Sequence, residues 1–570
     1  MEDEKDFKTD EWMLYERGKN YNLAMSLYDD TEKNYDFYNG KQWNNAKLGN
    51  VQPITLNIIK SIVKQKVGVL NSNDYQIVFN PNVYENYEQG QNLKDICKSL
   101  NKYANRLWEL EQVNKKVREI LKDSCINAEG IAHVYEENGE IKTEVIDKTN
   151  VYYGDESNDN IQEQPYILIT YRRTVDSIKE EARKNNMPEE EINKITADSD
   201  YEEQSGKENR IEEISPMCLV IRKYYKKNGT IWLKESTKTA KVRNEENTQL
   251  KLYPVAHMIW EDVKGYARGT GEVKYIIPNQ IEINKTATRR VIAVQMCAFP
   301  KLVANKRYIA NPASLNKVGT TILVDEMSAD DVNKVVNYLR PTTMSTDALN
   351  LQEELMKDTR DLAGAGDTVT GNVDPTQASG KAILAVQQAA QQPLNEQLEK
   401  FKTFLEDLAR IYFDMLQTYF KDGILVTKEE TNPETGEIIE TPYTISNEQL
   451  NNAKLNVKID ISPNSSYDKF AREQSIENLF LSGNITMEEY AKALPIDAVM
   501  DKTMIDNIIR DRQERNKKMT EIQMQANQLE SAMNQAMELQ GRGTQNEMSA
   551  MQTGGNVGRE SQKQSDEINV

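Results

Sequence analysis

The central stretch of the chain reads TDALNLQEELMKDTRDL (346–362), AGAGDTVTGNVD (363–374) and PTQASGKAILAVQQAAQQPLNEQLEKFKTFLEDLARIYFDMLQTYF (375–420). The first part predicts a helix whose leucines recur on one side. Its other side is acidic and carries Asp347, Glu353, Glu354, Asp358 and Asp361. The glycines that follow favour an exposed loop, because glycine accepts positive φ and has weak helix propensity.

A second, longer helix is predicted after this loop. Asp374 can cap it, Pro375 fits its first position, and Gln377 completes a capping box. The apolar stripe of this helix consists of Leu394, Leu398, Phe401, Leu405, Leu408, Met415 and Tyr419. Pro393 lies within the run and is expected to kink the helix.

Composition limits the classes of protein to which this chain can belong. At 570 residues it can bury a large core, and its formal net charge of −19 argues against a protein that coats nucleic acid. Four widely spaced cysteines without a C-x-x-C pair predict neither a disulfide framework nor a zinc site. No N-terminal signal and no apolar run of about 18 residues is visible. We therefore expect a protein made in the cytosol.

The remaining segments predict an α+β fold that is predominantly helical. Residues 11–38 have helical periodicity, and Asn138-Gly139 and Asn228-Gly229 are typical of tight hairpin turns. Residues 185–213 are polar and acidic without an apolar period, which indicates a surface insertion. Later segments predict a hairpin over 423–444, a strand over 454–461, and helices after 466. Beyond 541 the sequence is of low complexity.

Residues 264–310 differ in charge from the rest of the chain. They hold nine cations and two anions, which gives +7 in a chain of −19. A helix is expected over 271–297, interrupted or bent near Pro278. A small α/β excursion is expected to follow, with strands near 301–304 and 321–324 and a helix from Ala329 to Leu339.

Motifs of enzyme active sites are absent from the sequence. The two histidines, His133 and His257, lie in predicted strands, and neither has a second histidine at ligand spacing. Adjacent carboxylates such as Glu353-Glu354 are more often solvated helix faces than catalytic pairs in a chain with 90 acidic residues. We therefore predict no catalytic, cofactor-binding or metal-binding residues.

The order of segments over residues 20–500 resembles the portal proteins of tailed double-stranded DNA phages. The resemblance rests on three places along the chain. They are FYNGKQW with PITLN (37–43 and 53–57), RGTGE (268–272) leading into a helix, and GAGDTVTGN with SGKAI (364–372 and 379–383). Each motif alone is weak, and their order and spacing carry the resemblance.

The resemblance implies a ring of twelve subunits at one capsid vertex, with a subunit made of wing, stem, clip and crown. The implied divisions are an N-terminal wing part (1–263), a first stem helix (264–297), a clip (298–345), a second stem helix (346–363), a tunnel loop (364–376), a kinked wing helix with a β segment (377–465), crown helices (466–540) and a disordered tail (541–570). The basic and acidic stem helices would attract one another and their neighbours around the ring, and charge would set the register between subunits more than it holds them together.

Two groups of residues follow from the resemblance as candidate functional sites. The tunnel loop facing the DNA channel would contain Gly364, Gly366, Asp367, Thr368, Val369, Thr370, Gly371 and Asn372. A basic patch on the stem and clip would contain Lys274, Lys285, Arg289, Arg290, Lys301, Lys306 and Arg307. These cations have two competing uses, which are contact with DNA or the packaging motor and ion pairs between subunits.

The implied function is a conduit for packaging and ejecting the genome, which docks the terminase motor and later the tail. The implied partners are other copies of the chain, double-stranded DNA, the large terminase subunit, capsid and scaffolding proteins, and head-completion, adaptor and tail proteins, with no membrane. The protein would be assembled in the host bacterial cytoplasm and reside in the virion. Two alternatives stay open: another head–tail structural protein, and a metal-dependent nucleic-acid enzyme.

Overall fold

The structure is a computed structural model, in which the chain divides into two compact units, Met1–Ser462 and Pro463–Val570. The described residues are 8–43, 52–71, 73–81, 87–198, 216–298, 301–304, 336–339, 346–365, 392–431, 438–452, 455–463, 476–486 and 517–533, together with Arg307, Ile309, Asn311, Ala313, Leu323, Tyr490 and Arg515.

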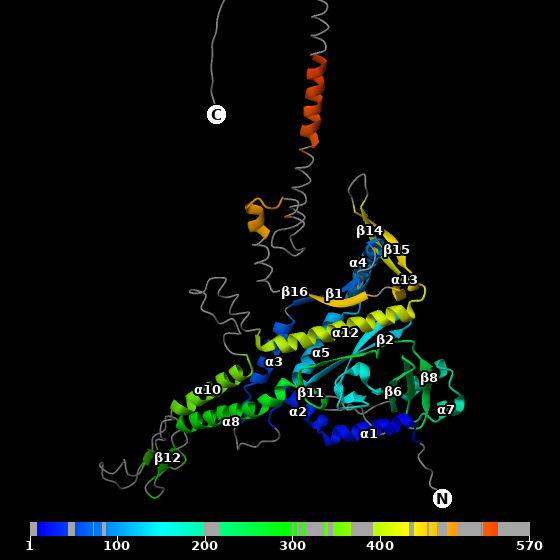
Figure 1. The fold of residues 1–570 in the computed structure, drawn as a ribbon. Helices are drawn as coiled ribbons and strands as arrows, with labels where there is room; N and C mark the ends of the chain where they lie inside the picture. The colour runs from blue at the N-terminus through cyan, green and yellow to red at the C-terminus, as the bar shows by residue number, and fades with distance from the viewer. Residues whose placement is uncertain are drawn as a thin grey trace, which may run out of the picture. The chain divides into compact units, whose positions relative to one another are not determined.

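Helices and antiparallel strands both build the first unit, which confirms the expected α+β class (Figure 1). Its described α-helices are α1 (Asp10–Ala24), α2 (Leu27–Asn39), α3 (Ile58–Leu70), α4 (Tyr87–Leu110), α5 (Val113–Asn127), α6 (Val175–Lys184), α7 (Glu189–Asn193), α8 (Glu272–Ala298), α10 (Thr346–Leu362), α12 (Asn395–Tyr419) and α13 (Asn447–Asn452). Its described strands are β1 (Asn73–Pro81), β2 (Glu129–Glu137), β3 (Glu140–Ile146), β4 (Val151–Tyr153), β5 (Tyr166–Thr174), β6 (Met217–Lys227), β7 (Thr230–Ser236), β8 (Lys241–Asn247), β9 (Val255–Ile259), β10 (Glu261–Val263), β11 (Tyr266–Thr270), β12 (Lys301–Ala304), β13 (Val336–Leu339), β14 (Ile424–Thr431), β15 (Ile438–Ile445) and β16 (Leu455–Pro463).

Two antiparallel sheets form the body of this unit. One has the strand order β3-β2-β9 and the other the order β4-β5-β6-β7-β8. Both expected hairpin turns are confirmed, because Asn138 and Gly139 have φ of 56° and 84°, and Asn228 and Gly229 have φ of 54° and 80°. Two successive positive φ values are what a type I′ turn requires, and the Asn-Gly dipeptide adopts them at low cost.

The expected helix over 11–38 is two helices rather than one. Ser26 has φ of 55°, in the left-handed region, and this breaks the chain between α1 and α2. Trp12 and Tyr15 on α1 are buried, and Tyr15 packs edge-on against Tyr152 at 5.3 Å between ring centroids. The break therefore lets α1 lie against the five-stranded sheet while α2 contacts α5 and α8.

Helix α12 lies across the body in Figure 1 and contacts β9 and β2. Of the predicted stripe, Phe401, Leu405, Leu408 and Met415 are buried, as the sequence predicts. Phe404 is buried beside them, whereas Tyr419 at the end of the helix is exposed, which corrects the prediction for that residue. Pro393 lies in a 3-10 turn, Gln392–Leu394, directly before α12. The start of the helix predicted at Pro375 lies outside the described residues, so Pro393 marks where the described helix begins.

Helices α8 and α10 lie side by side and run in opposite directions (Figure 1). α8 is one helix through Pro278, which corrects the expected interruption. At the far end of the pair, β12 pairs with β13 in antiparallel register from Lys301↔Leu339 to Ala304↔Val336. The helix expected over Ala329–Leu339 is therefore wrong for its last four residues, because pairing with β12 overrides their local preference.

The expected hairpin over 423–444 is confirmed as β14 and β15, in continuous register from Ile424↔Ile445 to Thr431↔Ile438. The expected strand near 454–461 is β16, whose partner is β1 from the start of the chain. In the second unit, residues 476–481 and 517–533 are helical, as predicted. Phe480 packs there against Tyr490, with ring centroids 4.9 Å apart.

Candidate functional site

The segment Glu261–Glu272, which contains β10, β11 and the RGTGE motif, joins α8 to the body, and we call it the α8 joint. Arg268 in β11 is fully buried and donates five hydrogen bonds, which uses its whole guanidinium. Two go to Glu156 at 2.9 Å each, one to Glu129 at 3.3 Å, and two to the backbone carbonyls of Lys148 and Val151 at 3.0 and 2.7 Å.

Because the ion cluster around Arg268 is buried, each of its charged groups needs its partners within the cluster. Burial raises the pKa of Glu129, while the positive charge of Arg268 favours its ionised form. The hydroxyl of Tyr153 donates to Glu129, and the guanidinium of Arg268 lies 4.6 Å from the centroid of the Tyr153 ring. Burial also lowers the pKa of Lys148 to about 8. Arg268 is thus a structural ion within the body and not a surface cation of the 264–310 region.

The PITLN segment is held by a polar ladder on α8. Gln280, Asn284 and Thr288 are buried and lie four residues apart, so they share one side of the helix. Their side chains accept hydrogen bonds from alternate backbone N–H groups: Ile58 to Gln280 (2.9 Å), Leu56 to Asn284 (2.9 Å) and Ile54 to Thr288 (3.1 Å). Two of the motifs that carry the family resemblance therefore belong to one packing unit. The signal for this contact was the polar series inside an otherwise apolar helix side.

Ion pairs connect the start of α8 to α3 and α2. The Glu272 carboxylate lies 2.7 Å from Lys66 Nζ of α3 and accepts a hydrogen bond from the indole of Trp260 at 3.2 Å. Lys274 Nζ lies 2.8 Å from Asp30 of α2. The Lys66–Glu272 pair is largely buried, whereas the Lys274–Asp30 pair is exposed and contributes about 0–1 kcal/mol.

The described hydrogen bonds between α8 and α10 do not join oppositely charged side chains. Asn279 donates to the Thr359 hydroxyl at 3.3 Å, and Arg290 donates to the Gln352 amide oxygen at 3.2 Å. The acidic residues Glu353, Glu354, Asp358 and Asp361 are exposed, and none makes an ion pair with a described residue. Within one chain, the described contacts between α8 and α10 therefore do not depend on the expected attraction between a basic and an acidic helix.

Comparison with known families identifies the family of this chain. A family model described as phage P22-like portal protein matches residues 21–557, which include the joint, the ladder and both helices. The chain belongs to this portal family. A search among curated proteins finds no match. Membership identifies a bacteriophage portal protein with a head-to-tail connector role, in a structural family of the virion rather than an enzyme family.

The residues predicted to form a tunnel loop lie almost entirely outside the described part of the chain. Gly366, Asp367, Thr368, Val369, Thr370, Gly371 and Asn372 all lie outside it. Gly364 is described and has φ of 64°, which ends α10. Its N–H donates to the carbonyl of Asp361 at 3.0 Å, and the N–H of Ala365 donates to that of Arg360 at 2.8 Å. Left-handed glycine at this place is a common way to end a helix, so the helix ends where the sequence predicts.

The residues of the predicted basic patch lie along α8 and beyond it rather than in one cluster. Lys274 and Arg290 are 16 positions apart, which is about 24 Å along a helix. Lys285 pairs with Glu282 of the same helix at 2.7 Å, and Arg289 is exposed without an ion pair to a described residue. Lys301 begins β12, Arg307 is exposed, and Lys306 lies outside the described residues.

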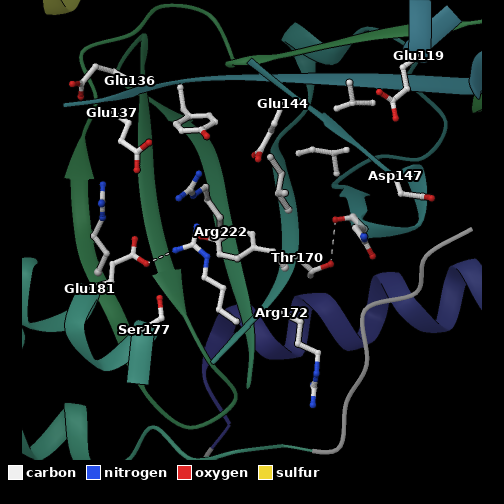
Figure 2. Close-up of a pocket in the computed structure, with 18 of the residues that line it drawn as sticks. Glu119, Glu136, Glu137, Glu144, Asp147, Thr170, Arg172, Ser177, Glu181 and Arg222 are labelled. Carbon is white, nitrogen blue, oxygen red and sulfur yellow. Dashed lines mark hydrogen bonds and ion pairs between the residues drawn. The ribbon is translucent and has the colours of Figure 1, made fainter. Parts of the chain in front are cut away.

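A polar basin of about 1090 Å³ lies between the two sheets and was not predicted from the sequence. Figure 2 shows Arg222 near its centre, with Glu137 and Glu181 on one side and Glu144 and Asp147 on the other. The arginines that line it are largely neutralised: Arg222 pairs with Glu235, Arg173 with Glu181 at 2.6 Å, and Arg172 with Asp198 at 2.9 Å. Because residues from many separate elements line the basin, no local sequence pattern could predict it.

No group of three histidine, cysteine or acidic side chains among the described residues could hold a metal ion. His133 is buried, and its two ring nitrogens lie 2.7 Å from Glu144 and 3.0 Å from the Tyr224 hydroxyl, as expected for a structural histidine. Within the described parts of the chain, every helix is too short or too polar to cross a bilayer.

Two partly buried groups, His257 and Asp123, give the stability of the body opposite pH dependences. Burial lowers the pKa of His257 to about 4, so between pH 6.5 and about pH 4 mainly the unfolded chain binds this proton, and stability falls as the pH drops through this interval. Burial raises the pKa of Asp123 to about 6, so the native carboxyl binds its proton first, and stability rises as pH drops through 6.

We expect His257→Gln to lose about 1 kcal/mol less stability than the parent when the pH falls from 6.5 to 5.5. Asp123→Asn should lose more than the parent over the same interval, because it removes the opposing proton uptake. Urea unfolding of the three proteins at both pH values measures these differences. Parallel pH profiles for all three proteins would contradict the assignment of these two groups.

Proposed function

We propose that this portal protein forms a closed ring of twelve copies at one capsid vertex, with double-stranded DNA passing along the axis. The observation that carries the proposal is the α8–α10 pair, which is rooted in the body through the α8 joint and ends near the paired strands β12 and β13. Copies related by one rotation axis repeat a single heterologous contact, and the ring closes when that rotation divides the circle.

The parts of the chain take the following proposed roles. The α+β body (1–263) with α12 and the following β segment (377–465) forms the wing. The helices at 264–297 and 346–363 form the stem, and 298–345 forms the clip. Residues 466–540 form the crown, and 541–570 a disordered tail. Support comes from the family match over 21–557 and from the order of the described elements, in which a helix pair flanks two paired strands along the chain.

The loop after α10 is proposed to line the channel as residues 364–376. Its side chains are small or polar, and Asp367 would repel phosphate, so the loop can touch DNA without holding it. The net charge of −19 acts in the same direction. A channel with these properties suits DNA that moves inward during packaging and outward during ejection.

The clip end is proposed to dock the large terminase subunit during packaging, and adaptor and tail proteins afterwards. The body would contact the capsid and scaffolding proteins. The family match supports partners of these kinds in general. Two uses are proposed for the α8 cations: contact with DNA or the motor, and pairing between copies. Arg289 is exposed and has no described ion-pair partner, so its side chain is available for either use.

The mass and symmetry of the purified protein test the ring directly. We expect native mass measurement to find species of about twelve copies, and negative-stain images to show rings with an axial hole. A protein that stays monomeric or dimeric under all assembly conditions, without such rings, would contradict the proposal. Metal-dependent cleavage of DNA that co-purifies with the protein through every chromatographic step would instead favour the enzyme alternative.

A further inference from the structure

The polar basin between the two sheets has an acidic side, which we call the acidic lobe: the carboxyls of Glu119 and Asp123 on α5 and of Asp147. Glu119 and Asp123 lie four residues apart on one face of α5. Asp147 comes directly before the 3-10 turn Lys148–Asn150, and Figure 2 shows it on the same side of the basin as Glu119, away from Glu181. Burial, together with the charges of Asp147 and Glu119, raises the pKa of Asp123 to about 6. The three carboxyls are therefore close enough to repel one another.

The negative charge of the acidic lobe is only partly balanced within the chain. Lys122 also lines the lobe, but it forms no ion pair with any of the three carboxylates. Asp123 accepts a hydrogen bond from the hydroxyl of Tyr35, and Asp147 accepts from the N–H and the hydroxyl of Thr149 at 3.0 and 2.9 Å. These partners are neutral, so at neutral pH the lobe keeps an excess of negative charge.

A buried amide beside these carboxylates lacks a hydrogen-bond donor. Asn150 lines the basin and is only 3% exposed. Its backbone N–H donates to the carbonyl of Asp147 at 2.9 Å, and its own carbonyl accepts from the Thr170 hydroxyl at 3.2 Å. Among the described residues, no group donates to its side-chain Oδ1. Because a buried acceptor without a donor is unfavourable, Oδ1 indicates a donor that these residues do not supply.

An ammonium group has the charge and the donors that the acidic lobe lacks. It is a compact cation with three N–H donors and no acceptor, which matches in number the carboxylates of Asp123 and Asp147 and the Oδ1 of Asn150. A divalent metal ion would instead need a tight shell of oxygen ligands. No group of three histidine, cysteine or acidic side chains in the described part of the chain could provide that shell.

We propose that the acidic lobe binds a primary alkylammonium group, held by the carboxylates of Asp123 and Asp147 and by the Oδ1 of Asn150, while the exposed Glu119 adds negative charge. Two sources carry this group: a free aliphatic polyamine and the lysine side chain of another protein. Double-stranded DNA has a condensed atmosphere of cations, and aliphatic polyamines are organic cations of this kind. The basin lies within one copy of the chain, so the site does not depend on the proposed ring.

Calorimetric titration of the full-length protein with putrescine, a linear diamine, tests the site. We expect saturable binding at neutral pH, weakened about tenfold by Asp123→Asn and about threefold by Glu119→Gln. An asparagine can still accept from Tyr35, and Glu119 is exposed, so both variants should keep the fold. Glu180→Gln is the matched control, because Glu180 on α6 is exposed and lines the basin outside the acidic lobe. It should change the affinity less than about twofold.

Proton release upon binding gives a second readout. A cation beside Asp123 favours its ionised form, so at pH 6 putrescine should displace up to about half a proton per site, and almost none at about pH 8. Titrations in two buffers of different ionisation enthalpy measure this release. Asp123→Asn should abolish it, although the other groups around Asp123, which are Glu119, Lys122, Asp147 and Tyr35, remain in place.

Further titrations separate the sources and the alternatives. Tighter binding of putrescine than of Nα-acetyl-lysine amide supports a free polyamine, and the reverse order supports a lysine side chain. Failure of both ligands to saturate the protein would overturn the proposal, as would equal weakening by Glu180→Gln. Displacement of putrescine by Mg²⁺, beyond that caused by NaCl at the same ionic strength, would show a metal site and overturn it too. None of these results depends on whether rings form.

Discussion

Replacing Arg268 with alanine is expected to lower the free energy of unfolding of the body by about 3–5 kcal/mol, because it strands two carboxylates in the interior. Glu129 is fully buried and Glu156 is largely buried, and Arg268 is the cation that neutralises both. The substitution also frees the carbonyls of Lys148 and Val151, which accept hydrogen bonds from the guanidinium. Removing the central charge of a buried ion cluster destabilises a protein by far more than the intact cluster stabilises it.

Urea unfolding followed by tryptophan fluorescence measures this loss, since Trp260 is buried in the same joint and donates to Glu272. Arg410→Ala is the matched control, because Arg410 also faces two acidic residues, Asp407 at 2.7 Å and Glu406 at 3.6 Å, but at the exposed surface of α12. Its loss should stay within about 1 kcal/mol. Equal losses of unfolding free energy in the two variants would show that the buried cluster does not stabilise the α8 joint more than an exposed ion pair does.

Arg268 also shows where sequence reasoning reached its limit. In the sequence it is one of nine cations within 264–310, and nothing in its local pattern separates it from the exposed Arg289. Its carboxylate partners lie more than 100 residues upstream and in two different segments, so the cluster exists only once the sheets are assembled. The motif was a good signal of the family and a poor signal of the role of its arginine.

Local signals performed better where a short stretch decides its own conformation. The Asn-Gly turns, the stripe of α12 and the left-handed glycine that ends α10 were all predicted, because neighbouring residues suffice to set φ or a helix face. The strand Val336–Leu339 and the pairing of β1 with β16 were missed, since each depends on a distant partner. The polar basin was missed for the same reason.

Gly269→Ala is the second substitution with a large expected effect, at about 2–5 kcal/mol of lost stability. Gly269 has φ of 65°, which costs a residue with a Cβ about 1–2 kcal/mol. A Cβ there would also lie 2.3 Å from Ile259 Cγ2 and 2.4 Å from the backbone oxygen of Glu261. The backbone of the neighbouring strand cannot yield as a flexible side chain can, so overpacking adds about 1–3 kcal/mol.

The same hairpin offers a control that isolates the steric part. Gly265 has φ of 76°, but a Cβ added to it would meet no atom within 4 Å, so Gly265→Ala meets only the conformational cost of about 1–2 kcal/mol. The difference between the two variants in urea unfolding therefore measures the close approach of β11 to β9 and β10. Because Arg268 is the residue before Gly269, this approach also aims the guanidinium at Glu129 and Glu156. Equal losses for the two glycine variants would mean that the strands separate easily, and the joint would then be too soft to orient α8 for the contact between copies.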